Sequence, residues 1–188
     1  TYFQFRITNI VNSGADGLVF VIQPVSSSIG GGGGGEGYQG ITPSVGIEFD
    51  TYPNAWDPNG NHIGVLTNGS VSTYVAGPVT PSTGMENGNV WSVWIDYNGT
   101  TLEVRVADNS TVRPSSPILA TNINIASIIG QNTAYVGFTA GTGADAENHD
   151  ILSWRYNDTF SPIGGGAVGT PALSDWALIL LAGILAAI

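Results

Sequence analysis

Apolar and polar positions alternate along most of this chain, which predicts β-strands because successive side chains of a strand point to opposite faces. The alternating segments are rich in β-branched and aromatic residues, and Gly, Asn, Asp or Pro bounds most of them. They cover residues 2–9, 17–23, 44–51, 62–68, 90–97, 101–107, 134–140 and 150–156. Only residues 122–129 have the character of a short helical turn. Many short strands at this spacing predict an all-β fold, an antiparallel β-sandwich.

The clearest turn signal joins two of these strands. Asn98 and Gly99 lie between the strands predicted at 90–97 and 101–107. Asn-Gly favours a type I′ turn, because both residues tolerate positive φ angles. The sequence therefore predicts a tight hairpin here.

The hydrophobic pattern changes after the last predicted strand. Residues 161–169 form a Gly-rich linker, Thr170 is suited to cap a helix, and Pro171 is suited to its first position. We expect an apolar C-terminal α-helix over residues 170–188, about 27 Å long, against a bilayer core of roughly 30 Å. A helix that is apolar on all sides must be buried. A membrane and a bundle of identical helices from neighbouring subunits are the two interpretations.

Length and charge restrict the classes of function. The chain has 188 residues, enough for one β-domain over residues 1–160 with a sizeable core. Fourteen acidic residues against four basic ones give a net charge of −10, which argues against binding nucleic acid. There is no Cys, so disulfides and thiolate metal sites are excluded. A surface without Lys and rich in small polar residues favours an extracellular location.

A run of metal-ligand side chains stands in the middle of the chain. Glu48 and Asp50 lie two apart in a predicted strand and so point to one face. Asn54 and Asp57 follow on a loop, and His62 begins the next strand. A strand end and a loop can bring all five around one point.

The ligand types in this run suggest two cations. Carboxylates, an amide and a backbone carbonyl suit Ca²⁺, whereas carboxylates with one imidazole suit Mn²⁺ or another transition ion. Asp50 and Asp57 could bridge the two ions. The alternative is a solvated acidic loop with a hydrogen-bonded histidine. Three carboxylates so close together repel one another unless a cation or a proton intervenes, which favours the metal interpretation.

Six consecutive glycines at residues 30–35 have two interpretations. Low complexity favours a flexible spacer. The other interpretation is a loop whose backbone approaches a ligand closely, where a side chain would not fit.

The run from Glu48 to Gly64 resembles the double-metal loop of the legume-type (L-type) lectins. The pattern of that loop is Glu-Phe-Asp-Thr-Phe/Tyr-X-Asn-X-X-Asp-Pro, followed by His-Ile-Gly. The resemblance implies a transition-metal site formed by Glu48, Asp50, Asp57 and His62. It also implies a Ca²⁺ site formed by Asp50, Asn54, Asp57 and the main-chain carbonyl of Tyr52.

Further stretches agree with this resemblance. Ala15-Asp16-Gly17 is similar to the family's Ala-Asp-Gly segment, whose Ala-Asp bond is typically cis. Residues 36–40, Glu-Gly-Tyr-Gln-Gly, are similar to its Gly-Gly-Tyr-Leu-Gly loop, and residues 135–140 and 148–154 to its last two strands. The resemblance covers residues 1–160 and implies a legume lectin-like jelly roll. The family's strands before the one at 2–9 have no counterpart here, so either this is a fragment or another chain covers that edge.

The resemblance implies a sugar site beside the metals. In it, Asp16 accepts hydrogen bonds from sugar hydroxyls, while the Gly37 amide and the Asn54 side chain donate. The ring of Tyr52 covers the apolar face of the sugar, and Ca²⁺ fixes the Tyr52 carbonyl and Asn54. The partners implied are glycans.

No arrangement of residues points to catalysis, so we expect no enzyme. His149 precedes a strand and is expected to be structural. Two carboxylates flanking a cleft could make a glycosidase, but the suitable carboxylates here are already metal ligands. Of the tryptophans, Trp56 beside the metal loop could belong to the core or to the rim; the core is expected to hold Trp91, Trp94 and Trp154.

The tail leads to a second hypothesis. Residues 170–176 resemble bacterial exosortase-type sorting tails, which carry a Pro-Thr-Leu-Ser-Glu-Trp-type core before an apolar helix. The resemblance implies a bacterial protein at the cell surface, with the membrane as a partner of the tail. The first hypothesis is therefore a metal-dependent lectin displayed on a microbial surface. The alternative is a homo-oligomeric subunit of an extracellular filament, with the C-terminal helices in its core and the lectin-like domain outside.

Overall fold

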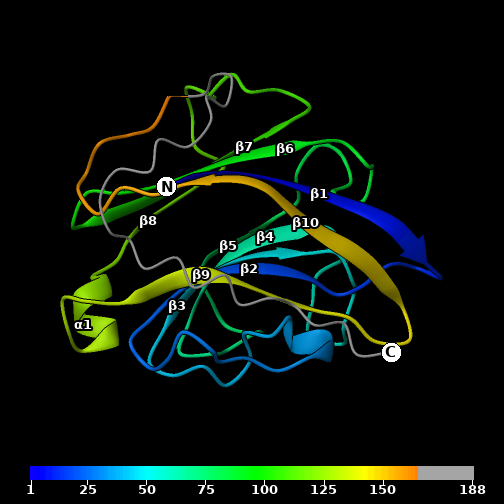
Figure 1. Cartoon of the computed structure of the whole chain (residues 1–188), viewed down its shortest axis with the longest axis horizontal. Coiled ribbons are helices and arrows are strands. Elements are labelled where there is room, and N and C mark those ends of the chain that lie inside the picture. The colour runs from blue at the N-terminus through cyan, green and yellow to red at the C-terminus, as the bar shows by residue number, and fades with distance from the viewer. Residues whose placement is uncertain (165–188) are drawn as a thin grey trace.

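The computed structural model describes residues 1–164, which form two antiparallel sheets of five strands packed face to face (Figure 1). In spatial order, the first sheet consists of β10 (Ala146–Arg155), β1 (Tyr2–Val11), β6 (Trp91–Tyr97), β7 (Thr101–Asp108) and β8 (Leu119–Asn122). The second consists of β5 (Tyr74–Val79), β4 (His62–Thr67), β3 (Val45–Asp50), β2 (Gly17–Gln23) and β9 (Tyr135–Gly141). The predicted antiparallel β-sandwich is confirmed.

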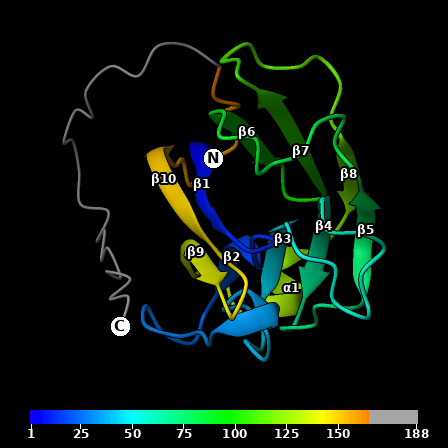
Figure 2. The same ribbon diagram turned by 90° about the vertical axis from the view of Figure 1, so that its right-hand side faces the viewer.

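Two short helical elements lie outside the sheets. The helix α1 (Ile125–Ile129) lies at one end of the sandwich, and the 3₁₀ turn η1 (Gly33–Gly35) lies toward the other (Figure 1). At one side of the sandwich, β8 and β5 bring the two sheets together (Figure 2). Within residues 1–164, no helix has the length and apolarity needed to cross a bilayer. The predicted apolar helix at 170–188 lies outside the described residues.

Aromatic side chains fill the space between the sheets. Phe3 lies at its centre, with its ring stacked against that of Phe20 and edge-on to those of Phe49 and Phe138. Phe3, Phe20 and Phe49 are buried, as is Trp91 nearer the sheet end. Each buried aromatic ring of this kind contributes about 1.5–3 kcal/mol through removal from water. This core holds the strand ends that carry the candidate site.

A third layer covers the outer face of the second sheet. Along β2, every position from Gly17 to Val21 is buried, because the alternating side chains meet the core on one face and a loop on the other. The loop over residues 24–44 runs beneath that sheet in Figure 1 and lays Tyr38 against its outer face. The apolar cluster formed there contains Val19, Val21, Tyr38, Ile41, Leu66 and Val71.

All eight predicted strands are present, with ends that differ by at most a few residues. The sequence did not predict β5 and β8. Each is an edge strand of its sheet, and the two lie at the same side of the sandwich. Within β5, Gly77 and Pro78 break the apolar alternation, and an edge position tolerates a Pro that has no N–H to donate. The short β8 offers too few residues for a pattern.

The hairpin between β6 and β7 is confirmed, but its predicted type I′ turn is wrong. Only Gly99 has a positive φ there, +98°. The side-chain oxygen of Asn98 instead accepts hydrogen bonds from the N–H groups of Thr100 and Thr101, at 3.0 and 2.8 Å. Asn closes this turn with its side chain, a local alternative to the two-residue turn.

Candidate functional site

Strand register brings the predicted metal ligands together. Asp50, the last residue of β3, pairs with His62 at the start of β4 on one side and with Gly17 at the start of β2 on the other. Ligand atoms of Glu48, Asp50 and His62 lie within 4.8 Å of one another, and all three residues are buried. Three of the predicted ligands therefore converge at one end of the second sheet.

The loop after β3 folds back so that Asp57 joins the group. The N–H of Tyr52 donates to Asp50 Oδ1 at 2.9 Å, and the N–H of Asn54 donates to Asp57 Oδ2 at 2.9 Å. The other oxygen of Asp57, Oδ1, lies 4.0 Å from Nε2 of His62. Backbone donors thus hold one oxygen of each aspartate. In Asp57 the other oxygen faces His62, whereas in Asp50 the held oxygen, Oδ1, is itself 3.8 Å from Nδ1 of His62.

The surroundings of His62 prepare it to be a ligand. Its Nδ1 lies 2.8 Å from the carbonyl oxygen of Asn59, which can only accept. In the neutral ring, Nδ1 therefore carries the proton, and Nε2 keeps a lone pair. That Nε2 lies 2.8 Å from the hydroxyl of Tyr74 and 3.4 Å from Oε2 of Glu48. Sequence reasoning missed Tyr74, because Tyr74 begins β5, a strand that the sequence did not predict.

Burial sets the electrostatics of the cluster. Burial and the neighbouring carboxylates raise the pKa of Asp50 to about 8. Burial also raises the pKa of Glu48 and of Asp57. For His62, burial alone would lower the pKa, but the hydrogen bond to Glu48 and the charges of Asp50 and Glu48 raise it. Buried carboxylates of this kind need protons or a cation nearby.

Unpartnered polar atoms support the cation. The carboxylate oxygens Glu48 Oε2 and Asp57 Oδ1 are buried without a hydrogen bond of good geometry, 3.4 and 4.0 Å from Nε2 of His62. Asn54 Nδ2 is also buried without a partner, but it is a donor and needs an acceptor, not a cation. Such atoms are costly unless a bound group satisfies them. Oxygen donors with one imidazole nitrogen suit divalent cations, so the residues present fit the expected metals.

Asp16 lies beside the metal loop, as the family resemblance implies. Its peptide bond with Ala15 is cis. Its carbonyl oxygen accepts from the N–H of Thr51 at 3.1 Å, and its own N–H donates to the carbonyl of Gly141 at 2.9 Å. Asp16 Oδ2 is buried without a partner, and burial raises the pKa of this carboxyl group. A carboxylate is thus fixed next to the loop and has an oxygen free to accept.

The glycine-rich segment approaches the same place. Gly37 has φ +69°, and a Cβ on it would lie 2.9 Å from Cβ of Thr139, so no side chain fits. Among the described residues, its N–H has no hydrogen-bond partner. A Cβ on Gly34 would lie 2.7 Å from Oδ1 of Asn54. Residues 34–37 therefore pack tightly against their surroundings, including the metal loop, whereas a Cβ on Gly31, Gly32 or Gly33 would meet no atom within 4 Å. The close approach of this segment to a ligand stays a prediction.

Two aromatic residues of the metal loop lie toward solvent. Tyr52 is half-buried, and Trp56 is 45% exposed, which places Trp56 at the rim. Trp91 belongs to the core between the sheets and Trp154 packs against it, as expected. Trp94 is buried, but against Tyr2 and outside that core, so its expected place was wrong. The rim could therefore offer ring faces to a ligand.

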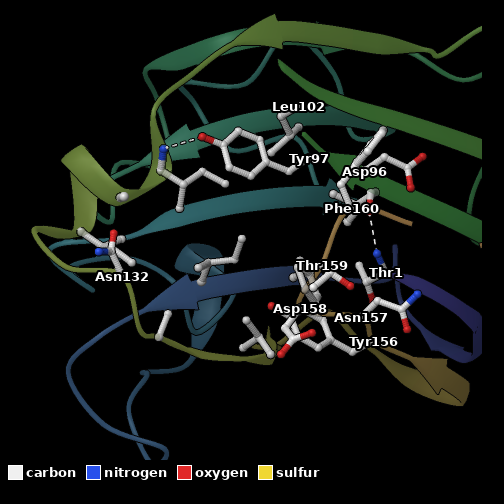
Figure 3. A pocket seen from close by; sticks show the side chains of 18 of the residues that line it. Thr1, Asp96, Tyr97, Leu102, Asn132, Tyr156, Asn157, Asp158, Thr159 and Phe160 are labelled. Atoms are coloured by element: carbon white, nitrogen blue, oxygen red, sulfur yellow. Dashed lines mark hydrogen bonds between the residues drawn. The ribbon is translucent and has the colours of Figure 1, made fainter. Parts of the chain in front are cut away.

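A separate hollow of about 270 Å³ lies between the sheets at the α1 end (Figure 3). Apolar side chains such as Phe20 and Ile129 line it together with residues 156–161. In Figure 3, the hydroxyl of Tyr97 accepts from the N–H of Ile125, at 3.3 Å. No residue of the metal loop lines this hollow.

The comparisons with known proteins identify the family. The legume lectin domain matches residues 1–164, the whole of the described part. The chain belongs to the legume lectin family. The bark lectin of Styphnolobium japonicum is 35% identical over 178 residues, which are 89% of this chain and 64% of that protein. The L-type lectin-domain containing receptor kinase VIII.1 of Arabidopsis thaliana is 34% identical over 91% of this chain and 25% of its own length.

Solved legume lectin structures share the fold. The acidic lectin of winged bean, complexed with methyl-α-D-galactose, has a TM-score of 0.65 and 30% identity over 80% of this chain and 65% of that one. The basic winged bean lectin with Tn-antigen has a TM-score of 0.62 and 33% identity over the same share of this chain. This legume lectin chain spans slightly less than two thirds of the bark lectin and of both structures.

Proposed function

We propose that this legume lectin domain binds a carbohydrate, and that bound cations organise the site. One observation carries the proposal. The buried Asp16 Oδ2 has no partner, and it stands beside a loop whose own buried atoms, on Asp57 and Asn54, also have none. A sugar and a pair of cations would satisfy these atoms.

Each residue has the role that the family resemblance implies and that its chemistry permits. The Asp16 carboxylate accepts hydrogen bonds from two sugar hydroxyls, and its charge strengthens them. The Asn54 amide and the Gly37 N–H donate to the sugar. The ring of Tyr52 covers the apolar face. The four groups together contact the hydroxyl groups and the apolar face of a sugar.

The metal ligands act on the sugar only through the loop. Glu48, Asp50, Asp57 and His62 would hold Mn²⁺ or another transition ion. Asp50, Asn54, Asp57 and the Tyr52 carbonyl would hold Ca²⁺. When bound, the cations neutralise the carboxylates and fix the loop. A loop that the cations have already fixed loses less conformational entropy when the sugar binds, which favours binding.

Calorimetric titration of the full chain with methyl-α-D-galactoside tests the proposal, a probe chosen because a relative's structure contains this sugar. A glycan array extends the test to other sugars. We expect chelation with EDTA to abolish binding while the circular dichroism of the sheets persists. Asp16→Asn should weaken binding about 100-fold, roughly 2.7 kcal/mol, because an amide replaces an acceptor by a donor. Ca²⁺ affinity should stay unchanged in this variant.

Asp158→Asn, at an exposed carboxylate, is the matched control and should bind like the unmodified chain. Full glycan affinity in the stripped protein, or in Asp16→Asn, would contradict the proposal. So would a glycan array without any binding to the metal-loaded chain.

The hypothesis of a surface filament depends on residues 170–188, which lie outside the described residues. The sorting-tail resemblance, the membrane partner and the homo-oligomer depend on the same segment. They stay predictions, as does the extracellular location. Deleting residues 171–188 would test the filament, because assembly of the shortened chain would show that the tail is not the polymerisation element.

A further inference from the structure

A fifth acidic side chain is buried beside the site and has no assigned role. Glu36 is 1% exposed, and neither of its carboxylate oxygens meets an N–H or hydroxyl donor; the group within hydrogen-bonding reach is the carboxyl group of Asp50. Its backbone is left-handed, with φ 51° and ψ 28°, at the end of η1. The similar loop of the family has Gly at this position, which suits such a backbone.

Keeping a glutamate here is costly in three ways. A non-glycine residue in the left-handed region costs about 1–2 kcal/mol. A carboxylate loses its hydration on burial, and its unsatisfied oxygens add to the cost. No arginine of the described residues offsets these costs, since all four are engaged elsewhere: Arg6 with Asp150, Arg105 with Asp96 and Glu103, Arg113 with Asp96, and Arg155 over the ring of Tyr2.

The carboxylate lies on the Asp50 side of the metal cluster. A Cβ on Gly17 would lie 2.7 Å from Oε1 of Glu36 and 3.0 Å from Cα of Asp50. The space that Gly17 leaves free is therefore occupied by the carboxylate of Glu36. Glu36 lies outside the group of Glu48, Asp50 and His62 that meet within 4.8 Å. Because β2 and β4 flank β3 on opposite sides, Glu36 lies on the side of Asp50 away from His62. The expected Ca²⁺ site, whose ligands are all oxygen atoms, is called the oxygen-lined site below.

We propose that Glu36 is a carboxylate ligand of the oxygen-lined cation site, in addition to the residues of the metal loop. Ca²⁺ accepts six to eight oxygens and tolerates irregular arrangements, so a further carboxylate can join its ligands. With Glu36 included, Glu48, Asp50 and Asp57 bring the site to four negative charges, which balance two divalent cations. The inference rests on the proposed function insofar as it requires that the site hold a cation.

This ligand would connect the two loops of the sugar site. Glu36 directly precedes Gly37, and its N–H donates to the carbonyl of Gly33 at 2.8 Å. A cation held by Glu36 would fix the loop that carries the Gly37 donor. The same cation fixes Asn54 through the metal loop. The relative position of the two donors would then depend on one bound ion.

Calcium titration of the chelator-stripped full chain tests the inference, with Glu36→Gln and Glu36→Gly as variants. We expect both to weaken Ca²⁺ binding at least tenfold, because each removes the charged ligand. Glu36→Gly also removes the left-handed strain and the buried carboxylate, so the stripped variant should melt at a higher temperature than the stripped unmodified chain. Asp158→Asn, which also replaces a carboxylate by an amide but at an exposed position, should alter neither quantity.

Unchanged Ca²⁺ affinity in the two Glu36 variants would overturn the inference and mark Glu36 as a neutral buried acid. If Glu36→Gln does not fold, Glu36→Gly decides, because it restores the residue that this backbone favours. Ca²⁺ binding that depends on Glu36 without any glycan binding would uphold the inference and contradict the proposed function. Glycan binding with unaltered Ca²⁺ affinity in the variants would contradict the inference and uphold the proposed function. An unmodified chain that takes up no Ca²⁺ would contradict both.

Discussion

A pair of glutamates near Asp16 shows how single residues set the charge of this region. Glu147 is buried and accepts hydrogen bonds from the Thr51 hydroxyl and from His149 Nε2, the latter at 2.9 Å. This contact gives His149 the structural place expected of it. Burial and the neighbouring Glu147 raise the pKa of Glu86 to about 8. Burial alone would raise the pKa of Glu147, but its hydrogen bonds, including the one with Glu86, lower it.

The shifted pKa of Glu86 predicts a pH-dependent effect of Glu86→Gln. The folded chain holds the Glu86 proton up to about pH 8, whereas the unfolded chain releases it near pH 4.5. Stability should therefore fall as pH rises across this window. Gln resembles the protonated form, so the variant should be more stable than the unmodified chain above pH 8, by about 1 kcal/mol after screening by solvent.

Urea unfolding at about pH 5 and about pH 9 measures this difference in the free energy of unfolding. The gain should shrink toward zero at the lower pH. Asp158→Asn, at an exposed carboxylate outside both sheets, is the control. An equal effect of Glu86→Gln at both pH values would contradict a raised pKa of Glu86 in the folded chain.

At the scale of elements, the site depends on the loop layered over the second sheet. The ring of Tyr38 lies on the outer face of β3, where Gly46 leaves room for it. The Tyr38 hydroxyl accepts from Oγ of Ser44 at 2.9 Å, which holds the ring in place. Since Tyr38 directly follows Gly37, the position of the proposed sugar donor depends on the packing of this ring.

Gly46→Ala tests this dependence. The new Cβ would lie 2.8 Å from Cζ of Tyr38, so the ring must move. We expect a loss of about 1–3 kcal/mol in the free energy of unfolding, as for other overpacked interiors, together with weaker sugar binding. Gly137→Ala on β9 is the matched control, because no atom lies within 4 Å of its Cβ. Equal stability of the two variants would show that the loop does not depend on this contact.

At the scale of the whole molecule, two sources of stability are separate. The aromatic core between the sheets involves no metal ligand, whereas the end of the second sheet gathers Glu36, Glu48, Asp50 and Asp57. Removing cations should leave the sandwich folded but less stable, because the carboxylates then repel one another and must take up protons.

Thermal melting with and without chelator measures this contribution. Free Ca²⁺ at 100 times its Kd stabilises by about 2.7 kcal/mol, which corresponds to roughly 5–10 °C in a domain of this size. Addition of Ca²⁺ to the stripped chain should restore the higher melting temperature. A melting temperature that does not respond to chelation or to added Ca²⁺ would contradict a cation in this site.

The sequence by itself determined the class of fold and most of the metal loop. Alternation is a local signal, so each of the eight strands could be recognised without its partners. Glu48, Asp50, Asn54, Asp57 and His62 lie within fifteen residues of one another, and a strand with its following loop already brings them close. Asp16 and Gly37 came only from the family resemblance.

The tertiary structure alone decided which distant residues meet that loop. Tyr74 reaches His62 from an edge strand that a Pro concealed, and Glu147 reaches Thr51 from β10. In the sequence, Glu36 is one acidic residue in a glycine-rich loop. Only packing in the folded chain buries its carboxylate beside Gly17 and Asp50, away from any N–H or hydroxyl donor. Burial and the lack of a partner are properties of the assembled chain, because they depend on what every neighbouring element places around a side chain.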